Sequence, residues 1–352
     1  MRGRILVVAP SWVGDAILSE PLIAQLRAPQ GEPIVDVLAP AWCAALYARM
    51  RGVGQVFDST IGHGRVALGE RVALARALST RGYAQAVILP NSWKSALVPW
   101  LARIPLRTGY VGEMRWGLVN DARRLDRKAL PRLVDRYAAL AAPRGEPPPR
   151  APAPALVADT ENRAAALRAL GLEGQRRIAI LCPGAEFGPA KRWPPAHFGE
   201  LAQKFLANGL TVWIVGSPND KAIADAVVAA AGDARSALRD LTGRTDLGTA
   251  VDLLSLATVV VSNDSGLMHA AAALGAPLVA LFGSSSPAFT PPMSAAARIA
   301  RIEIACSPCF KRECPLGHFK CMRDLAPATV YDLARSALPP ESVPAEARPS
   351  IR

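Results

Sequence analysis

The 352-residue chain contains no long apolar run and has few aromatic residues, at 6% of the total. Its best candidate for a membrane span, residues 270–282, is interrupted by Gly275 and Pro277 and falls short of the ~20 apolar residues that a bilayer requires. The apolar start of the chain reaches Pro10 and Asp15 too early for a secretory signal. We therefore expect a soluble, cytoplasmic protein with one large or two medium domains.

Nucleotide-binding fingerprints are also missing. The segment "APSWVGDAILSEPL", which follows the first predicted strand, contains a single glycine where a dinucleotide site would need G-x-G-x-x-G, so NAD or FAD binding is not expected there. The G-x-x-x-x-G-K-[ST] spacing of a Walker A loop is absent as well. No nucleic-acid motif occurs in the chain, and we expect no nucleic-acid partner.

Acidic residues are scarce relative to basic ones, which gives a net charge of +12. Residues 1–150 hold 21 basic and 11 acidic residues, whereas residues 151–352 hold 20 and 18. The excess is densest over residues 94–136, with ten basic and four acidic residues. A surplus of this kind suits an anionic lipid surface or a phosphorylated substrate, although an arginine-rich composition without a partner would also explain it.

Strand and helix patterns alternate in both halves, which is typical of βαβ units around a parallel sheet. Expected strands are residues 4–9, 34–39, 86–90, 177–182, 210–215, 259–261 and 278–282. Expected helices are residues 15–27, 42–51, 66–79, 195–208, 219–231, 249–256, 267–274 and 328–338.

Six prolines within residues 142–158 separate the two halves and predict an extended, stiff linker that does not pack. We therefore expect an α/β fold of two doubly wound domains with a cleft between them. The boundaries are an N-terminal domain over residues 1–148, a proline-rich linker over 149–158, a C-terminal domain over 159–338 and a tail over 339–352.

Asp15 lies in the first turn of the first predicted helix. A carboxylate at this position complements the helix dipole by ~0.3–1 kcal/mol, which is sufficient reason for its presence. The same corner, at the carboxyl edge of a parallel sheet, would also suit a general base that takes a proton from a hydroxyl. From this corner alone, the dipole role is favoured.

Two further corners follow predicted strands in the second half. In "CPGAEFGPAKRWPPAHF", Lys191 and Arg192 precede a helix, either as solvated charges or with the lysine pairing with a phosphate. In "VVVSNDSGLMHAAAALGAPLVALFG", Asp264 lies where a strand turns into a helix whose free backbone N–H groups suit an anion. His269 lies one helical turn after Ser265, where either packing or a ligand contact would explain it.

A cysteine-rich stretch, "CSPCFKRECPLGHFKC", contains Cys306, Cys309, Cys314, Cys321 and His318. C-x-x-C followed by two further cysteines is acceptable for a tetrahedral zinc site, although the second pair is spaced more widely than usual. Stable disulfides are not expected in the cytoplasm. A structural zinc site and a thiol-rich surface loop are equally supported, and no catalytic metal is expected.

Four blocks in the chain resemble a known family: "PSWVGDAILSEPL", "LPNSWKSALVPWLARIPLRTGYVGEMRWGLVND", "PGAEFGPAKRWP" and "NDSGLMHAAAALGAPLVALFGSSSPAFTPP". Together they span about residues 4–292, with a weaker helix near 328–338, and resemble the heptosyltransferases of glycosyltransferase family 9, type II in particular. The resemblance implies the GT-B fold, in which two Rossmann-like domains face each other across a cleft. It also implies a Gram-negative, inverting transferase that moves L-glycero-D-manno-heptose from ADP-heptose to the first heptose of the lipopolysaccharide inner core.

The resemblance assigns roles to individual positions. Asp15 matches the catalytic base, which reverses the preference reached from its corner alone. Lys191 matches the lysine at the donor phosphates, and Asp264 matches the aspartate at the donor heptose. Ser265, Gly266 and Leu267 match the backbone amides that hold the pyrophosphate, and His269 lies in the same motif. Thr242 and Arg244 align more loosely with a segment that contacts the nucleoside. Helix-end amides and a lysine would stabilise the departing ADP without any cofactor.

The basic first domain then has a partner, because lipid A and the inner core are anionic. The acceptor-side candidates are Asn91, Ser92 and Lys94 in "NSWKS" and Arg115 in "GEMRW". Lys94 and Arg115 would pair with carboxylates of Kdo sugars or with phosphates, unless they only form a solvated basic face. We expect peripheral, salt-sensitive association with the inner face of the inner membrane.

Three alternatives stay open. A type I heptosyltransferase uses the same donor on a Kdo acceptor, although "PSWVGD" and "PGAEFGPAKRWP" favour type II. A non-catalytic GT-B protein would bind a sugar nucleotide, but the presence of Asp15, Lys191 and Asp264 argues against it. The third alternative is a metal sensor built around the cysteines.

Overall fold

The computed structural model describes residues 3–27, 33–61 and 65–338. The chain divides into two compact units, Met1–Val157 and Ala158–Arg352. Each unit is built on a six-stranded sheet whose neighbouring strands all pair in parallel. Within the described residues, no helix is long and apolar enough to cross a membrane.

The sheet of the first unit has the strand order β3-β2-β1-β4-β5-β6. Its strands are β1 (Arg4–Val8), β2 (Val35–Pro40), β3 (Val53–Ser59), β4 (Tyr83–Ile88), β5 (Leu106–Tyr110) and β6 (Asp121–Arg123). Its helices are α1 (Val13–Leu18), α2 (Glu20–Arg27), α3 (Ala41–Tyr47), α4 (Leu68–Ser79), α5 (Trp93–Leu101) and α6 (Leu133–Ala138), with a 3₁₀ turn at Ala139–Ala141.

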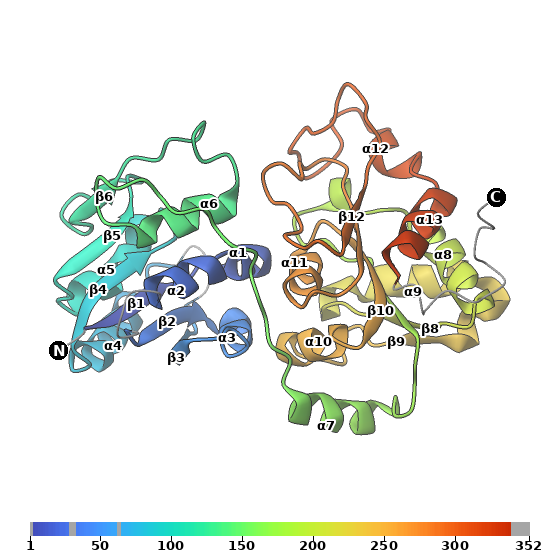
Figure 1. Ribbon diagram of the computed structural model, residues 1–352, viewed down its shortest axis with the longest axis horizontal. Helices are drawn as coiled ribbons and strands as arrows, with labels where there is room; N and C mark the ends of the chain where they lie inside the picture. The colour runs from blue at the N-terminus through green and yellow to red at the C-terminus, as the bar shows by residue number, and fades with distance from the viewer. Residues whose placement is uncertain (1–2, 28–32, 62–64, 339–352) are drawn as a thin grey trace, which may run out of the picture. The chain divides into compact units, whose positions relative to one another are not determined.

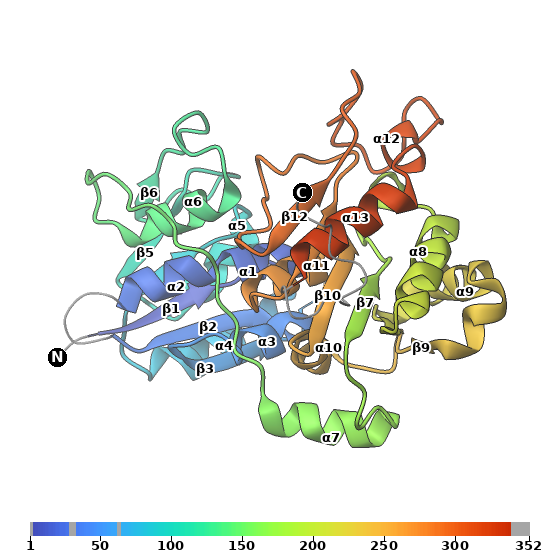
Figure 2. The ribbon, with the colours of Figure 1, turned by 45° about the vertical axis from the view of Figure 1, so that its right-hand side comes forward.

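Helices cover both faces of this sheet. Figures 1 and 2 show α2 and α6 side by side on one face. On the other face, Leu78 of α4 and Val98 of α5 pack in one buried cluster with Leu6 of β1 and Ala86 of β4. Because the central strands are covered on both sides, β1 from Ile5 onward and β4 from Ala86 onward are apolar on both faces, which explains why these runs do not alternate.

The single helix expected over residues 15–27 is in fact two helices, because the chain breaks at Ser19. The buried Ser19 hydroxyl donates to the carbonyl of Ala16 at 2.6 Å and lies 3.2 Å from the Tyr47 hydroxyl. A serine that bonds its own helix backbone competes with the helical hydrogen bonds, and Pro21 cannot donate one. The break leaves Asp15 on a six-residue helix of its own.

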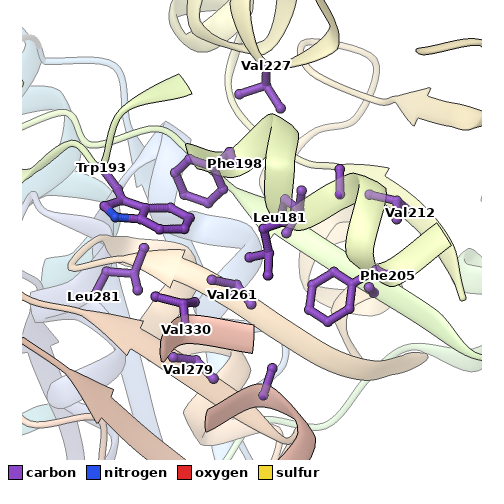
Figure 3. Close-up of a cluster of buried hydrophobic side chains, with 14 of the residues drawn as sticks. Leu181, Trp193, Phe198, Phe205, Val212, Val227, Val261, Val279, Leu281 and Val330 are labelled. Carbon is purple, nitrogen blue, oxygen red and sulfur yellow. The ribbon is translucent and has the colours of Figure 1, made fainter. Parts of the chain in front are cut away.

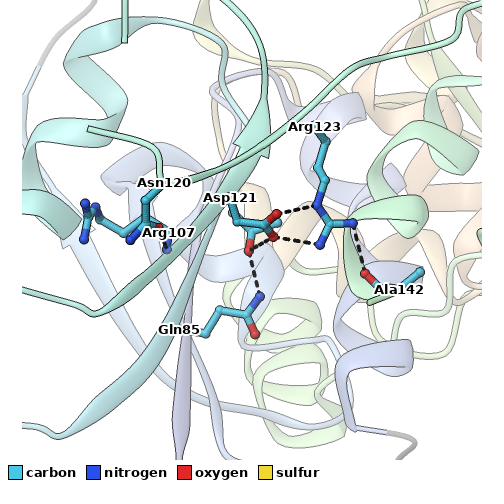
Figure 4. A network of polar contacts seen from close by, with 7 residues as sticks. Gln85, Arg107, Asn120, Asp121, Arg123 and Ala142 are labelled. Carbon is cyan, nitrogen blue, oxygen red and sulfur yellow. Dashed lines mark hydrogen bonds and ion pairs between the residues drawn. The ribbon is translucent and has the colours of Figure 1, made fainter. Parts of the chain in front are cut away.

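A polar network fastens the short edge strand β6 to the sheet (Figure 4). Arg123 and Asp121 form an ion pair at 2.7 Å, and Asp121 accepts a hydrogen bond from Thr108 at 2.9 Å. Gln85 of β4 donates to Thr108, and Arg123 donates to the carbonyl of Ala142 at 3.2 Å. The hydrogen bonds and charge of Arg123 hold the pKa of Asp121 below its usual range despite burial.

The proline-rich stretch 142–159 contains no helix or strand, as its composition predicts. The expectation that it does not pack is wrong, because Ala151 and Leu156 are buried. The amide of Val157 also donates to the carbonyl of Arg49 at 2.9 Å. The end of the stretch therefore packs along the first unit.

Glu20, the first residue of α2, is a second anchor for this stretch. Its carboxylate accepts a hydrogen bond from the amide of Ala155 at 3.2 Å. The side chain is only 5% exposed, and burial raises its pKa to about 7 against the lowering effect of that amide. The tail predicted at residues 339–352 lies outside the described residues.

The sheet of the second unit has the order β12-β11-β10-β7-β8-β9. Its strands are β7 (Ile178–Cys182), β8 (Thr211–Ile214), β9 (Leu238–Asp240), β10 (Ala257–Asn263), β11 (Leu278–Leu281) and β12 (Ala297–Ala300). Its helices are α7 (Thr160–Leu170), α8 (Pro195–Ala207), α9 (Lys221–Ala230), α10 (Leu247–Leu254), α11 (Gly266–Ala273), α12 (Lys320–Arg323) and α13 (Pro327–Ala337).

The main core of the second unit lies between its sheet and α8, α9 and α13 (Figure 3). Trp193 and Phe198 are fully buried and meet edge to face at 4.9 Å, and the Trp193 indole donates to the carbonyl of Leu325 at 2.9 Å. Figures 1 and 2 show α13 beside α8, so the last described helix closes this core. Truncation of Phe198 to alanine should cost about 3–5 kcal/mol.

The expected fold class is confirmed: both sheets are parallel and doubly wound. Counted within its own unit, each sheet has the strand order 3-2-1-4-5-6 and places its first and fourth strands side by side. Ligands bind such sheets outside the carboxyl ends of the strands, at this reversal of strand order. The two reversals are therefore where the predicted site residues should lie.

Candidate functional site

Asp15 lies in the first turn of α1, the helix that follows β1, at the strand reversal of the first unit. The hydroxyl of Tyr137, on α6, hydrogen-bonds to its carboxyl group. Burial raises the pKa of three nearby groups, Tyr137, Tyr47 and Cys43, and the negative charge of Asp15 raises it further. The pKa of Cys43 rises to about 12. All three stay neutral at physiological pH, so Tyr137 can orient the Asp15 carboxylate as a hydrogen-bond donor. Sequence reasoning missed Tyr137, because it lies 122 positions away on an ordinary helix.

The acceptor-side candidates Asn91, Ser92 and Lys94 lie where β4 ends and α5 begins. Asn91 is exposed, and Ser92 is the residue before the first turn of α5. Because β4 pairs in parallel with β1, this corner shares the carboxyl edge of the sheet with Asp15. The structure therefore brings these three candidates to the same edge as the predicted base.

The surroundings of Arg115 differ from both expectations, which were a contact with acceptor carboxylates or phosphates and a solvated basic face. Its side chain is buried, and its guanidinium donates four hydrogen bonds: two to the carbonyl of Tyr110, one to the carbonyl of Pro90 at 2.7 Å and one to Asn91 Oδ1 at 3.2 Å. Burial lowers its pKa, and these oxygens replace water around the charge. Arg115 is thus neither a solvated cation nor a surface ligand group. It holds the Pro90–Asn91 segment in place.

The donor-side candidates Lys191 and Asp264 form a buried ion pair. Lys191 follows β7 and Asp264 follows β10, and these two strands are neighbours at the reversal of the second sheet. The ammonium lies 2.6 Å from Asp264 Oδ2, with side chains 17% and 4% exposed. The hydroxyl of Ser285 also hydrogen-bonds to that oxygen, and the ring of Phe187 lies 5.0 Å below the ammonium. Ser285, from the quoted block "GSSSP", was not singled out in the sequence.

The corner between β10 and α11 presents backbone donors. Ser265 precedes α11 in an extended conformation, and Gly266 and Leu267 open the helix. The first amides of a helix have no intrahelical acceptor, so they are free to bond an anion. His269, one turn later, is buried, and burial lowers its pKa to about 4, helped by the charge of Lys191. His269 is therefore a neutral imidazole near pH 7 and cannot add positive charge.

Asn263, which sequence reasoning passed over, fastens this corner to the loop after β7. The residue is fully buried, accepts a hydrogen bond from the amide of Trp193 at 3.0 Å and donates to the carbonyl of Pro183 at 2.7 Å. These bonds fix the ends of the loop that carries Lys191. The sequence did offer an indication of this role, because Asn263 is a polar residue directly before Asp264 and, when buried, requires hydrogen-bond partners.

Thr242 and Arg244 lie apart from this pair. They follow β9, which is two strands away from β7 in the sheet. Thr242 is buried, and its amide donates to Asp240 Oδ1 at 2.9 Å, whereas Arg244 is exposed. A nucleoside contact at this position would lie along the carboxyl edge, two strands away from the strand that precedes Lys191.

The four cysteines of the predicted zinc site line one small cavity of the second unit. Burial and the nearness of the other three thiols raise the pKa of Cys321, and the amide of Phe319 points at the sulfur of Cys314 at 3.4 Å. Among the residues that the structure describes, however, no three His, Cys, Asp or Glu side chains are arranged so that they could hold a metal ion. Zinc at this cavity stays a prediction.

Comparisons with known proteins agree with this arrangement. The profile of glycosyltransferase family 9 (heptosyltransferase) matches residues 71–320. The lipopolysaccharide heptosyltransferase 2 of Salmonella typhimurium is 42% identical over 97% of this chain and 100% of its own, and that of Escherichia coli is 43% identical over 94% and 97%.

A solved structure, the ADP-heptose LPS heptosyltransferase II of Escherichia coli, superimposes with a TM-score of 0.85 at 40% identity, covering 95% of this chain and 98% of its own. The expected GT-B class, in the sense of two Rossmann-like units in one chain, is confirmed. The chain belongs to glycosyltransferase family 9, the heptosyltransferases, and is a glycosyltransferase.

Proposed function

We propose that this chain transfers a heptose from ADP-heptose to the first heptose of the lipopolysaccharide inner core. The observation that carries the proposal is the near full-length match, at 42% identity, to a lipopolysaccharide heptosyltransferase 2. The chemistry of the two sheet corners supports it. One corner presents a carboxylate suited to activate a hydroxyl, and the other presents a cation and amides suited to a diphosphate.

On the acceptor side, Asp15 is the general base. Its carboxylate takes the proton of the acceptor hydroxyl as the hydroxyl oxygen attacks the anomeric carbon of the donor heptose. The hydrogen bond from Tyr137 keeps the carboxylate oriented during this step. Asn91, Ser92 and Lys94 bind the acceptor, and Arg115 positions Asn91 rather than touching the sugar.

On the donor side, the bond between the anomeric carbon and the β-phosphate oxygen breaks, and its electron pair leaves with ADP. Lys191 and the amides of Ser265, Gly266 and Leu267 stabilise the developing negative charge, so the leaving group needs no proton. Asp264 holds Lys191 and contacts the donor heptose. The attack opposite to the leaving group inverts the anomeric configuration, and no cofactor enters the scheme.

The acceptor in this proposal is lipid-anchored, which requires the protein to work at the inner face of the inner membrane. The charge surplus of +10 in residues 1–150 supports a peripheral, electrostatic attachment of the first unit to anionic lipid.

The test is ADP release from ADP-heptose with monoheptosylated Kdo–lipid A as acceptor. Wild-type protein should release ADP only when the acceptor is present. Asp15→Asn removes the base at almost unchanged volume and should lower kcat by about 10²–10⁴ while leaving donor binding intact. Asp58→Asn, at an exposed carboxylate of the same unit, is the matched control and should be as active as wild type.

The same assay separates the alternatives. Release with Kdo–lipid A that lacks heptose, but not with the heptosylated acceptor, would make the chain a type I enzyme. Donor binding without release on either acceptor would make it a non-catalytic binding protein. Full activity of Asp15→Asn would keep the transferase and return Asp15 to its helix-dipole role.

A further inference from the structure

The two most exposed large hydrophobic side chains in the described residues are neighbours in one loop. Trp116 is 81% exposed and Met114 is 77% exposed, and Val111 in the same loop is 55% exposed. The loop, residues 111–120, connects β5 to β6. Single exposed apolar residues are normal on a protein surface, but three within six positions need a reason.

The exposure of these side chains does not come from a loose loop. Arg115, between Met114 and Trp116, points inward and bonds the carbonyls of Tyr110 and Pro90. The next part of the loop is held by Arg107, which donates to the carbonyls of Gly117 at 3.2 Å and Leu118 at 2.6 Å.

Further contacts fix both ends of the loop. Val119 is buried, and Asn120 bonds the amide of Arg107 at 2.7 Å and the carbonyl of Pro105 at 2.7 Å. The amide of Val111 donates to the carbonyl of Arg123 at 2.8 Å. The fold therefore holds Met114 and Trp116 outward on a fixed backbone, which reduces the entropy lost when they bind.

Exposed basic residues follow the loop in the sequence, and over residues 111–128 they outnumber the exposed acidic residues by three to two. Arg124, Arg127 and Lys128 are exposed in the segment that follows β6. The carbonyl of Arg123, the last residue of β6, accepts a hydrogen bond from the amide of Val111 at the start of the loop. The exposed acidic residues nearby are Glu113 and Asp126. A tryptophan and a methionine beside an excess of arginine and lysine match the composition of segments that insert at the interface of anionic membranes.

We propose that loop 111–120 is a membrane-docking element, in which Met114 and Trp116 enter the interface of an anionic lipid surface and Arg124, Arg127 and Lys128 bind its headgroups. This inference rests on the proposed function in one respect, since it takes the lipid that carries the acceptor as the partner. It adds which residues make the contact and that part of the contact is apolar.

Docking at this loop is linked to the acceptor segment. Arg115, whose neighbours enter the lipid, donates directly to Pro90 O and Asn91 Oδ1. Two hydrogen bonds thus connect the loop to the acceptor segment. Insertion of Met114 and Trp116 would therefore hold Asn91 close to the membrane surface that carries the lipid-anchored acceptor.

The experiment is sedimentation of the full chain with vesicles of phosphatidylcholine containing phosphatidylglycerol, and with vesicles of phosphatidylcholine alone. The variant Met114→Ser/Trp116→Ser should bind the anionic vesicles at least about tenfold more weakly than wild type, since each lost apolar side chain contributes one of the insertion contacts. Arg124→Gln/Arg127→Gln should remove the preference for anionic lipid. In wild type, tryptophan emission should shift to shorter wavelength on binding, and this shift should be absent without Trp116.

The matched control is Ile34→Ser/Trp100→Ser. Ile34 is 48% and Trp100 is 46% exposed, and they lie just before β2 and near the end of α5, outside loop 111–120. This variant should bind vesicles like wild type. Equal binding by wild type and Met114→Ser/Trp116→Ser, or equal losses in that variant and the control, would overturn the proposal.

Transfer assays separate this inference from the proposed function. The loop variant should lose transfer to an acceptor embedded in vesicles and keep transfer to a deacylated, water-soluble acceptor. Equal loss on both acceptors would overturn docking and indicate a contact with the sugar itself. Absence of all transfer in wild type would count against the proposed function, whereas the vesicle-binding result would still decide the role of the loop.

Discussion

Glu20 provides a stability change whose sign and size follow from the structure. Burial raises its pKa from 4.5 to about 7 in the folded chain. Between these values the folded chain keeps a proton that the unfolded chain releases, so the folded state is the better proton binder. The contribution of Glu20 to stability therefore falls as pH rises through this window, and the full penalty is present above about pH 7.

The magnitude follows from the same pKa values. At about 1.4 kcal/mol per pH unit, the rise from 4.5 to about 7 corresponds to about 3 kcal/mol. Glu20→Gln removes the ionisation and keeps an oxygen that can accept the Ala155 amide. The variant should match wild type at pH 4.5 and exceed its stability by up to about 3 kcal/mol at pH 8. For a unit of this size, that raises Tm by about 6–12 °C.

Calorimetric unfolding of both proteins at pH 4.5, 6 and 8 tests this prediction. Other ionisable groups titrate equally in both proteins, so the difference between them isolates Glu20. Glu146→Gln replaces an exposed glutamate of the same unit and should give no pH-dependent difference. A Tm difference that is constant across pH, or a wild type that is the more stable protein at pH 8, would refute the reasoning.

Three further predictions concern the site. Lys191→Met leaves the carboxylate of Asp264 buried without its cation, so it should destabilise the second unit by about 3–5 kcal/mol. Thermal unfolding measures this loss, and the double variant Lys191→Met/Asp264→Asn should recover part of it. Arg115→Lys cannot reproduce the forked hydrogen bonds, so it should raise KM for the acceptor at unchanged ADP affinity, measured by steady-state kinetics and calorimetric titration; an unchanged KM would remove its positioning role. Metal analysis of the reduced protein decides between the two interpretations of the cysteine cavity: about one zinc ion per chain, lost in Cys306→Ser/Cys309→Ser, would establish a zinc site, and a metal-free wild type would establish the thiol-rich loop.

The central part of each sheet was predictable from the sequence, because buried parallel strands are continuous apolar runs. Strands β1, β7 and β11 begin and end within two residues of their expected bounds. Edge strands carry no such run. β3 contains no buried residue and β6 is only three residues long, so neither was expected.

The candidate donor corner followed from the sequence better than the candidate acceptor corner did. Lys191 and Asp264 each follow a recognisable central strand, and neighbouring parallel strands bring their carboxyl ends together. Arg115 comes from a loop between two strands that were not expected. Its burial depends on backbone carbonyls at positions 90 and 110, and no side-chain pattern in the sequence encodes those partners.

The equal strand order of the two sheets has a consequence for how this chain can diversify. Each unit carries its own reactive corner on a complete doubly wound sheet, and the chain passes from one unit to the other at Val157–Ala158. Under the proposed function, substitutions that change the recognised hydroxyl can therefore accumulate in the first unit while the second unit, which would bind the sugar nucleotide, stays constant. A chimera joined at this position to the second half of a relative should inherit its donor preference from that relative and its acceptor preference from this chain.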